Sequence, residues 1–167
     1  MHLGLVIKVF LFLILFKADF KFRLVNEQGK TIRLSLEPKS IYIIRTGVSC
    51  KDCFRVIGQK LVDIKQKKYF ISTIFKKEPI YLVNQEIKKF LPDPGNWTLL
   101  YEPLKEKMEF GTEYSAKGIC SHFKISRSPY AIMIDSANNV TTYKYEQIFD
   151  SDGISLKQEF IAALSAN

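Results

Sequence analysis

Two cysteines separated by two residues lie in the stretch SCKDCFRVIGQKL, residues 49–61. Cys50 and Cys53 have the spacing used in thiol–disulfide exchange, where one thiolate attacks a substrate disulfide and a second cysteine resolves the product. The same Cys-x-x-Cys spacing can supply half of a zinc site. The two cysteines can also be close without a joint function. We therefore consider a redox pair, a zinc half-site and an inert pair.

The cysteine pair coincides with the start of a predicted helix. Apolar residues recur there with the helical period, at Phe54, Ile57, Leu61 and Ile64. Ser49 followed by Asp52 resembles a capping box, which predicts Ser49 as the N-cap and Cys50 as the first helical residue. A helix N-terminus stabilises an anion, so Cys50 should ionise more readily than a free thiol.

Charged neighbours act on the same thiol. Lys51, Arg45 and Arg55 bring positive charge close in sequence, and Asp52 partly opposes them. Cys53 lies one helical turn further in, where it should be shielded from solvent. This arrangement favours Cys50 as the attacking and Cys53 as the resolving cysteine.

The zinc alternative needs two further ligands, which Cys120 and His122 could supply. Residues i and i+2 share a face if this segment is a strand. Cys-x-His is, however, an unusual spacing for zinc ligands, and no turn residues frame it. Cys120 is more simply interpreted as a buried packing residue. The residues favour the redox pair, and the zinc site and inert pair remain alternatives.

Composition and charge limit the classes of protein. The chain has 167 residues, 47% of them hydrophobic, which suits one globular domain with a core. Its net charge is +8, but the lysines are dispersed beside apolar residues and no nucleic-acid recognition motif accompanies them. We therefore expect no nucleic-acid partner, and we expect a monomer.

The N-terminus predicts export. Residues 9–16 are an unbroken apolar run between Lys8 and Lys17, too short to span a bilayer as a helix of about 20 residues. Such a run is typical of a secretory signal. We interpret residues 1–18 as a signal peptide or a short membrane anchor, and 19–167 as the folded domain. A buried strand of a cytosolic protein is the alternative.

Hydrophobic periodicity predicts the remaining elements. Apolar alternation or apolar runs predict seven strands, at 19–26, 31–36, 40–47, 68–77, 97–102, 128–135 and 140–145. The first two strands form an N-terminal hairpin and the last two form a second hairpin. Besides the helix after Cys50, helices are predicted after Pro79 and after Ser155, which with Gln158 forms a capping box. The segment 103–122 is ambiguous. This order predicts an α/β fold, a mixed sheet with helices on both faces.

These features together resemble the thioredoxin superfamily. Two features carry the resemblance. A buried strand leads to Cys-x-x-Cys at the start of a helix, and Ser128-Pro129 later precedes the strand YAIMID, which belongs to a hairpin. The leading hairpin and the stretch FKISRSPYAIMIDSANNV are especially similar to exported bacterial thiol–disulfide oxidoreductases of the TlpA-like redoxin branch. The resemblance covers about residues 20–165 and implies a thioredoxin-like fold with an N-terminal hairpin extension.

The resemblance also implies roles for individual residues. Cys50 matches the attacking cysteine and Cys53 the resolving one. Pro129 matches a cis-proline that faces them and helps to hold a bound polypeptide, with Ser128 supplying backbone contacts. This sequence departs from the family pattern at two places. Ser49 occupies the position before the first cysteine, where the family commonly has tryptophan. Lys51-Asp52 replaces the usual Gly-Pro, a dipeptide that helps to set the reduction potential.

The residues and the resemblance together predict an exported thiol–disulfide oxidoreductase that works through Cys50-Lys51-Asp52-Cys53. It is expected to exchange electrons with protein dithiols and disulfides, to need an upstream redox partner, and to bind no cofactor and no metal. A thioredoxin-fold scaffold without exchange activity is the first alternative, and a zinc-stabilised small domain is the second. The sequence leaves the direction of exchange open.

Overall fold

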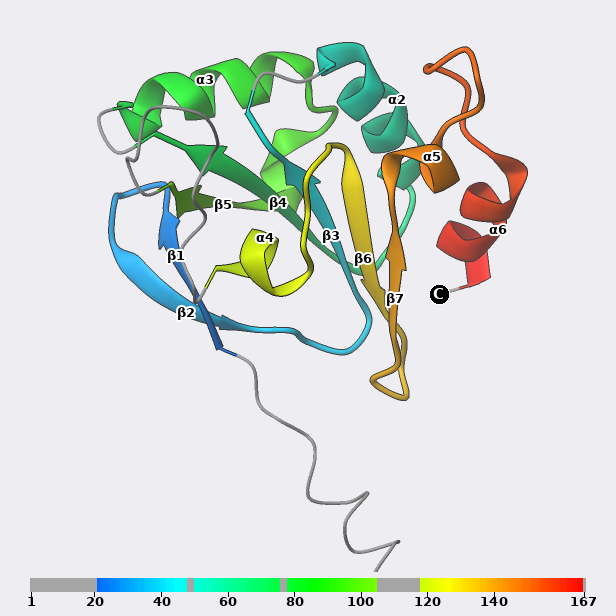
Figure 1. Ribbon diagram of the computed structural model, residues 1–167, viewed down its shortest axis with the longest axis horizontal. Helices are drawn as coiled ribbons and strands as arrows, with labels where there is room; N and C mark the ends of the chain where they lie inside the picture. The colour runs from blue at the N-terminus through cyan, green and yellow to red at the C-terminus, as the bar shows by residue number, and fades with distance from the viewer. Residues whose placement is uncertain (1–20, 48–49, 76–77, 105–117, 167) are drawn as a thin grey trace, which may run out of the picture.

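A mixed β-sheet forms the centre of the protein (Figure 1). The computed structural model describes residues 21–47, 50–75, 78–104 and 118–166. Within these residues the sheet has seven strands in the order β2-β1-β5-β4-β3-β6-β7. The strands are β1 (Lys21–Asn26), β2 (Thr31–Ser35), β3 (Ser40–Arg45), β4 (Lys67–Ile74), β5 (Trp97–Pro103), β6 (Tyr130–Ile134) and β7 (Val140–Tyr143).

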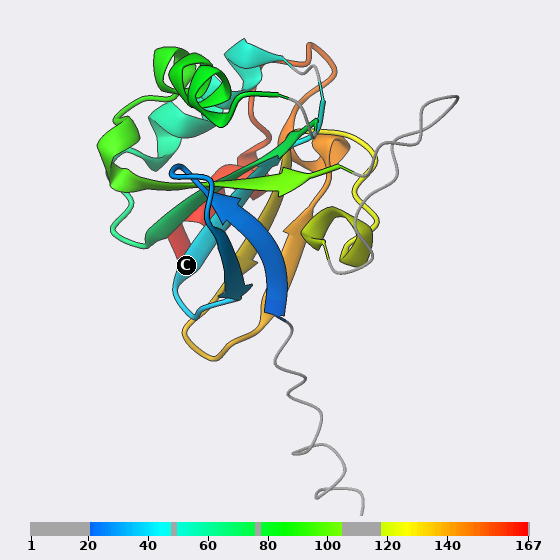
Figure 2. The same cartoon turned by 90° about the vertical axis from the view of Figure 1, so that its left-hand side faces the viewer.

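Helices cover both faces of this sheet. The helices are α2 (Lys51–Leu61), α3 (Ile80–Phe90), α4 (Ile119–His122), α5 (Tyr145–Ile148) and α6 (Gln158–Ala166), with a short 3₁₀ turn, η1 (Pro94–Asn96). Figure 2 shows α2 and α3 on one side of the sheet and α4 on the other. The fold class expected from the sequence, including the N-terminal hairpin β1–β2, is confirmed.

Strand β3 lies in the middle of the sheet. It runs parallel to β4 and antiparallel to β6, and all six of its residues are buried. Ile41 and Ile43 belong to the core under α2 and α3, whereas Tyr42 and Ile44 belong to the core on the α4 side. A strand buried on both faces explains the nearly continuous apolar run in its sequence.

Helix α2 is fixed to the sheet at both ends. Its buried face includes Phe54, whose ring packs edge-on against Phe70 of β4 at 5.2 Å between centroids. At the other end, Lys68 Nζ donates to the carbonyl oxygens of Leu61 at 3.0 Å and Ile64 at 3.1 Å. A cation there satisfies carbonyls that the last helical turn leaves unpaired. The N-terminus of α2 is therefore held in a defined position.

The C-terminal elements differ in detail from the sequence prediction. Ser155 is not the N-cap of α6, which begins at Gln158; the Ser155 hydroxyl instead donates to Asp152. Helix α4 lies in the segment 103–122, which the sequence leaves ambiguous, and α5 begins at Tyr145, which the sequence assigns to a strand. Four residues each are too few to show a helical period. The predicted leader, residues 1–18, lies outside the described residues. Within the described part, no helix is long and apolar enough to cross a membrane.

A buried carboxyl group connects β5 to α4. Glu102 is fully buried, and its Oε2 accepts a hydrogen bond of 3.0 Å from the backbone N–H of Cys120. Its Oε1 has no hydrogen-bond partner among the described residues. Burial raises the pKa of the Glu102 carboxyl, because the charged form loses its hydration.

Replacing Glu102 by Gln tests this assignment. The Glu102 carboxyl holds its proton more tightly in the folded protein than in the unfolded chain, where its pKa has the ordinary value of 4.5. The stability from the protonated carboxyl is fully present below that pH and is lost as pH rises through the folded-state pKa. Over that window the wild-type free energy of unfolding should fall relative to Glu102→Gln by up to about 1.4 kcal/mol per pH unit. Urea unfolding at several pH values measures this difference, and parallel profiles would contradict a raised pKa.

Candidate functional site

Cys50 and Cys53 lie at the N-terminus of α2, which follows β3 after a short connecting segment. The two residues form a disulfide, with their Cα atoms 5.3 Å apart. Cys50 is exposed to solvent, whereas Cys53 is buried with 1% of its surface accessible. An outside sulfur can therefore approach Cys50 but not Cys53.

Cys50 itself caps the helix. Its Sγ accepts a hydrogen bond of 3.1 Å from the backbone N–H of Cys53, and the first helical residue is Lys51. The prediction that Cys50 would be the first helical residue is thus wrong by one position, because the sulfur takes the capping role assigned to Ser49. Ser49 lies outside the described residues. An N-cap sulfur faces the unpaired N–H groups of the first turn, which strengthens the argument for a stabilised thiolate.

The positive charges expected around Cys50 are paired with carboxylates. Glu86 of α3 accepts from Lys51 at 2.9 Å and from Arg45 at 3.4 Å. The hydrogen bond from Lys51, together with the charge of Arg45, lowers the pKa of Glu86. Arg55 pairs with Asp52 at 2.6 Å. The helix N-terminus is therefore the main feature that favours an anion at Cys50. Sequence reasoning missed Glu86, since nothing in the spacing links α3 to the cysteines.

Ser128 and Pro129 lie beside the segment that leads from β3 to Cys50. Tyr130, the next residue, pairs with Ile44 of β3, and the Ser128 hydroxyl donates to the carbonyl oxygen of Thr46 at 3.2 Å. The Ser128–Pro129 peptide bond is cis, as the resemblance implies. The structure thus brings these two residues to the end of β3. Their role in binding a client stays a prediction.

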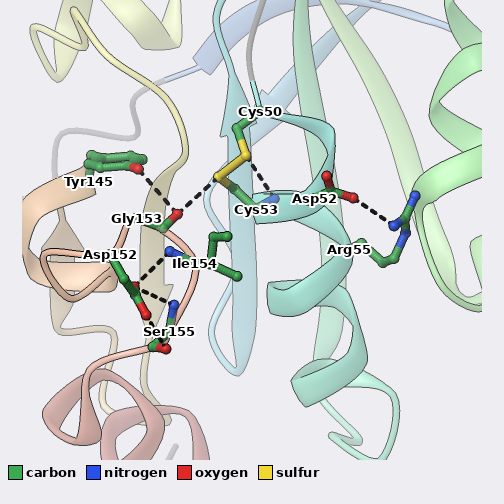
Figure 3. Close-up of a disulfide and its surroundings, with 9 residues drawn as sticks. All are labelled: Cys50, Asp52, Cys53, Arg55, Tyr145, Asp152, Gly153, Ile154 and Ser155. Atoms are coloured by element: carbon green, nitrogen blue, oxygen red, sulfur yellow. Dashed lines mark hydrogen bonds and ion pairs between the residues drawn. A yellow bond between two sulfur atoms is a disulfide. The ribbon is translucent and has the colours of Figure 1, made fainter.

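The loop after α5 contacts the buried cysteine, a contact that the sequence did not predict. The carbonyl oxygen of Gly153 lies 3.5 Å from Cys53 Sγ and accepts a hydrogen bond of 3.3 Å from the Tyr145 hydroxyl (Figure 3). Asp152 holds the turn by accepting from the backbone N–H groups of Ile154 and Ser155. Gly153 has φ of +71°, a conformation that favours glycine.

This carbonyl makes the two sulfurs unequal in the reduced protein. A Cys53 thiol can donate to the Gly153 oxygen, whereas a thiolate at the same place would meet its partial negative charge. Burial of Cys53 also opposes ionisation. Cys50 has the opposite environment, since it is exposed and faces N–H groups. The geometry therefore suits Cys50 as thiolate and Cys53 as thiol.

The remaining candidate residues do not join this site. Cys120 is buried in α4, where burial raises the pKa of its thiol. His122, also in α4, packs its ring against Phe22 and Phe123. Residues two apart on a helix point in nearly opposite directions, so the strand geometry assumed for a Cys120–His122 ligand pair is wrong. Among the residues that the structure describes, no group of three or more His, Cys, Asp or Glu side chains could hold a metal.

Comparison with known proteins adds fold evidence. No family model and no curated protein sequence matches the chain. A secreted Mycobacterium tuberculosis disulfide oxidoreductase, homologous to E. coli DsbE, superposes with a TM-score of 0.58 at 12% identity, over 90% of this chain and 99% of that one. MTB DsbF superposes with a TM-score of 0.53 at 14% identity, over 88% of this chain and 97% of that one. A SCO1/SenC family lipoprotein from Bacillus anthracis superposes with a TM-score of 0.52 at 12% identity, over 89% of this chain and 95% of that one.

These likenesses identify the class of fold. The two disulfide oxidoreductase structures share the overall fold of this chain over nearly their whole length. The chain has the thioredoxin-like fold, and the fold implied by the sequence resemblance is confirmed.

Replacing Glu86 by Gln tests the charge balance at Cys50. Lys51 and Arg45 lose their shared carboxylate, so their positive charge should favour the Cys50 thiolate. Reduced Glu86→Gln protein should react with iodoacetamide at Cys50 about two- to fivefold faster than wild type near pH 6, measured by mass spectrometry. Glu159→Gln removes the same charge from exposed α6 and should leave the rate unchanged. Equal rates for all three proteins would mean that Glu86 does not balance charge at the sulfur.

Replacing Gly153 by Ala tests the contact with Cys53. A Cβ there would lie 2.9 Å from the Tyr145 hydroxyl oxygen, whereas a Cβ at Gly29, with a similar φ of +76°, would meet nothing within 4 Å. Both alanine variants should lower the free energy of unfolding by roughly 1–2 kcal/mol, because each strains a left-handed residue. Only Gly153→Ala should also move the Gly153 carbonyl away from Cys53.

The kinetic measurement separates the two variants. Thionitrobenzoate bound to Cys50 as a mixed disulfide is released when Cys53 attacks Cys50. Release should be roughly tenfold slower or more in Gly153→Ala, because a displaced nucleophile attacks poorly, and unchanged in Gly29→Ala. Identical release rates would show that the 153 carbonyl does not position the resolving sulfur.

Proposed function

We propose that this protein is a thiol–disulfide oxidoreductase that acts on the disulfides or dithiols of other proteins. The observation that carries the proposal is the Cys50–Cys53 disulfide, with one exposed sulfur at a helix N-terminus and one buried sulfur behind it. The fold shared with a structure described as a secreted disulfide oxidoreductase supports it. An inert pair would need neither the capping geometry nor this difference in exposure.

The exchange proceeds in two displacements at sulfur. In the reducing direction, the Cys50 thiolate attacks one sulfur of a client disulfide and expels the other client sulfur as a thiolate, which takes up a proton. Cys53 then loses its proton and attacks Cys50, which expels the second client thiolate and closes the Cys50–Cys53 disulfide. The client gains two electrons and the protein loses two. The reverse sequence oxidises a client dithiol.

An upstream redox partner restores the starting state. It supplies two electrons if the protein reduces its clients, and accepts two if the protein oxidises them. All transfers use sulfur atoms of the protein, the client and that partner, so the reaction requires no bound cofactor. Ser128 and Pro129, at the end of β3 beside Thr46, are the proposed backbone contacts for the client chain.

The proposed setting is outside the cytoplasm. Residues 1–18, with their apolar run between two lysines, act as a signal peptide or membrane anchor for the domain 19–167. The likeness to a secreted oxidoreductase and to a lipoprotein supports export. The domain acts as a monomer and binds no nucleic acid.

Trapping of clients tests the assigned roles. Cys53→Ser leaves Cys50 able to attack but removes the sulfur that releases the client, so mixed disulfides should accumulate. Cys50→Ser should trap at least about tenfold less, because Cys53 is buried. Full-length variants expressed in cells and separated on non-reducing gels give the comparison. Equal trapping by the two variants would contradict these roles, and no trapping by either would favour a scaffold.

A redox titration of the full-length protein shows whether it reduces or oxidises its clients. Differential alkylation of Cys50 and Cys53 reports the oxidised fraction at each potential. A reversible two-electron midpoint below about −250 mV would indicate a reductant, and one near about −120 mV an oxidant. The absence of a transition would overturn the proposed function.

A further inference from the structure

A small polar pocket lies on the surface next to the cysteine site. It has a volume of about 170 Å³. It is lined by residues from the segment before β6, from the first position of β6 and from around the start of α5: Lys124, Ile125, Ser126, Arg127, Tyr130, Lys144, Tyr145 and Glu146. None of these residues belongs to the exchange reaction described above, apart from the contact of Tyr145 with Gly153.

Two residues of the pocket are linked to the cysteine site through one intervening contact each. The Tyr145 hydroxyl donates to the Gly153 carbonyl, whose oxygen also contacts Cys53 Sγ (Figure 3). Arg127 immediately precedes Ser128, whose hydroxyl donates to Thr46 in the segment leading to Cys50. A polypeptide bound along Ser128 and Pro129 would therefore carry its neighbouring side chains past the pocket.

The charge of the pocket is predominantly positive. Its charged side chains are Lys124, Arg127, Lys144 and Glu146. Arg127 pairs with Glu146 at 3.0 Å and lies over the Tyr145 ring, 3.9 Å from the centroid. Lys124 and Lys144 are exposed and form no ion pair with any described residue. Two lysines thus remain available to an incoming carboxylate.

We propose that this pocket selects client proteins with acidic residues next to the reactive cysteine. The inference rests on the proposed exchange function and names its substrate class. An Asp or Glu side chain of the client binds between Lys124 and Lys144 while the neighbouring client sulfur meets Cys50. The net charge of +8 adds a general attraction for acidic partners. Local pairing in the pocket adds selectivity to that attraction.

Two matched peptides test the proposal. Each is cyclised by one disulfide, and they differ only in the residues beside the cysteines, two Glu in one and two Lys in the other. Pre-reduced full-length protein donates two electrons to the peptide disulfide, giving two peptide thiols and the Cys50–Cys53 disulfide. Each rate constant is divided by the rate of the same peptide with dithiothreitol, which corrects for intrinsic reactivity.

The acidic peptide should react about fivefold faster than the basic one at low ionic strength. The preference should decline in about 0.5 M NaCl, because salt screens exposed charges. In the double variant Lys124→Glu, Lys144→Glu, the preference should disappear or reverse.

A second double variant separates the pocket from the overall charge. Lys60→Glu, Lys89→Glu produces the same change in net charge at exposed positions on α2 and α3. It should keep the preference for the acidic peptide. Equal loss of preference in both double variants would overturn the pocket and leave only general electrostatic attraction.

The wild-type protein is also assayed with hydroxyethyl disulfide, which is small and uncharged. Normal reaction with this compound but no preference between the peptides would overturn the acidic-client proposal and leave the exchange function standing. No reaction with hydroxyethyl disulfide or either peptide would overturn both. A preference lost only in Lys124→Glu, Lys144→Glu would support both.

Discussion

The hydrogen bond from the Cys53 N–H group to Cys50 Sγ sets the chemistry of the site, because it places a sulfur at the positive end of α2. It works only if that helix end is held still. The buried face of α2 packs on the sheet through Phe54, and Lys68 binds the carbonyls at the far end. Because β3 is buried on both faces, it gives the helix a closely packed base.

The two sulfurs differ because each faces a different part of the backbone. Cys50 Sγ accepts the backbone N–H of Cys53 from its own helix, whereas Cys53 Sγ meets the carbonyl oxygen of Gly153. A donor stabilises a thiolate and an acceptor stabilises a thiol, so the same residue type can perform two roles. The loop keeps its shape through the Tyr145 hydroxyl and the turn held by Asp152. The resolving role therefore depends on a segment a hundred residues away in sequence.

Positive and negative side chains are nearly balanced beside Cys50, whereas positive side chains are in excess in the adjacent pocket. Glu86 neutralises Lys51 and Arg45, which limits how far nearby cations can stabilise the thiolate. The uncompensated cations, Lys124 and Lys144, instead surround the adjacent pocket. Backbone groups thus govern the sulfur chemistry, and side-chain charge is available for recognising a partner.

Local sequence determined much of this protein: the hairpin β1–β2, the buried strand β3, the helical face of α2, and the Cys-x-x-Cys pair at its start. Each rests on a periodicity or spacing that neighbouring residues create by themselves. Only the tertiary structure decided which charges and carbonyls surround the sulfurs. Glu86 and Gly153 reach the cysteines across the fold, so no local pattern marks them. The N-cap lies at Cys50 instead of Ser49, and Ser155 binds Asp152 instead of capping α6. Both hydrogen bonds join residues only three positions apart, so the sequence contained competing local partners and the backbone of the folded chain decided between them.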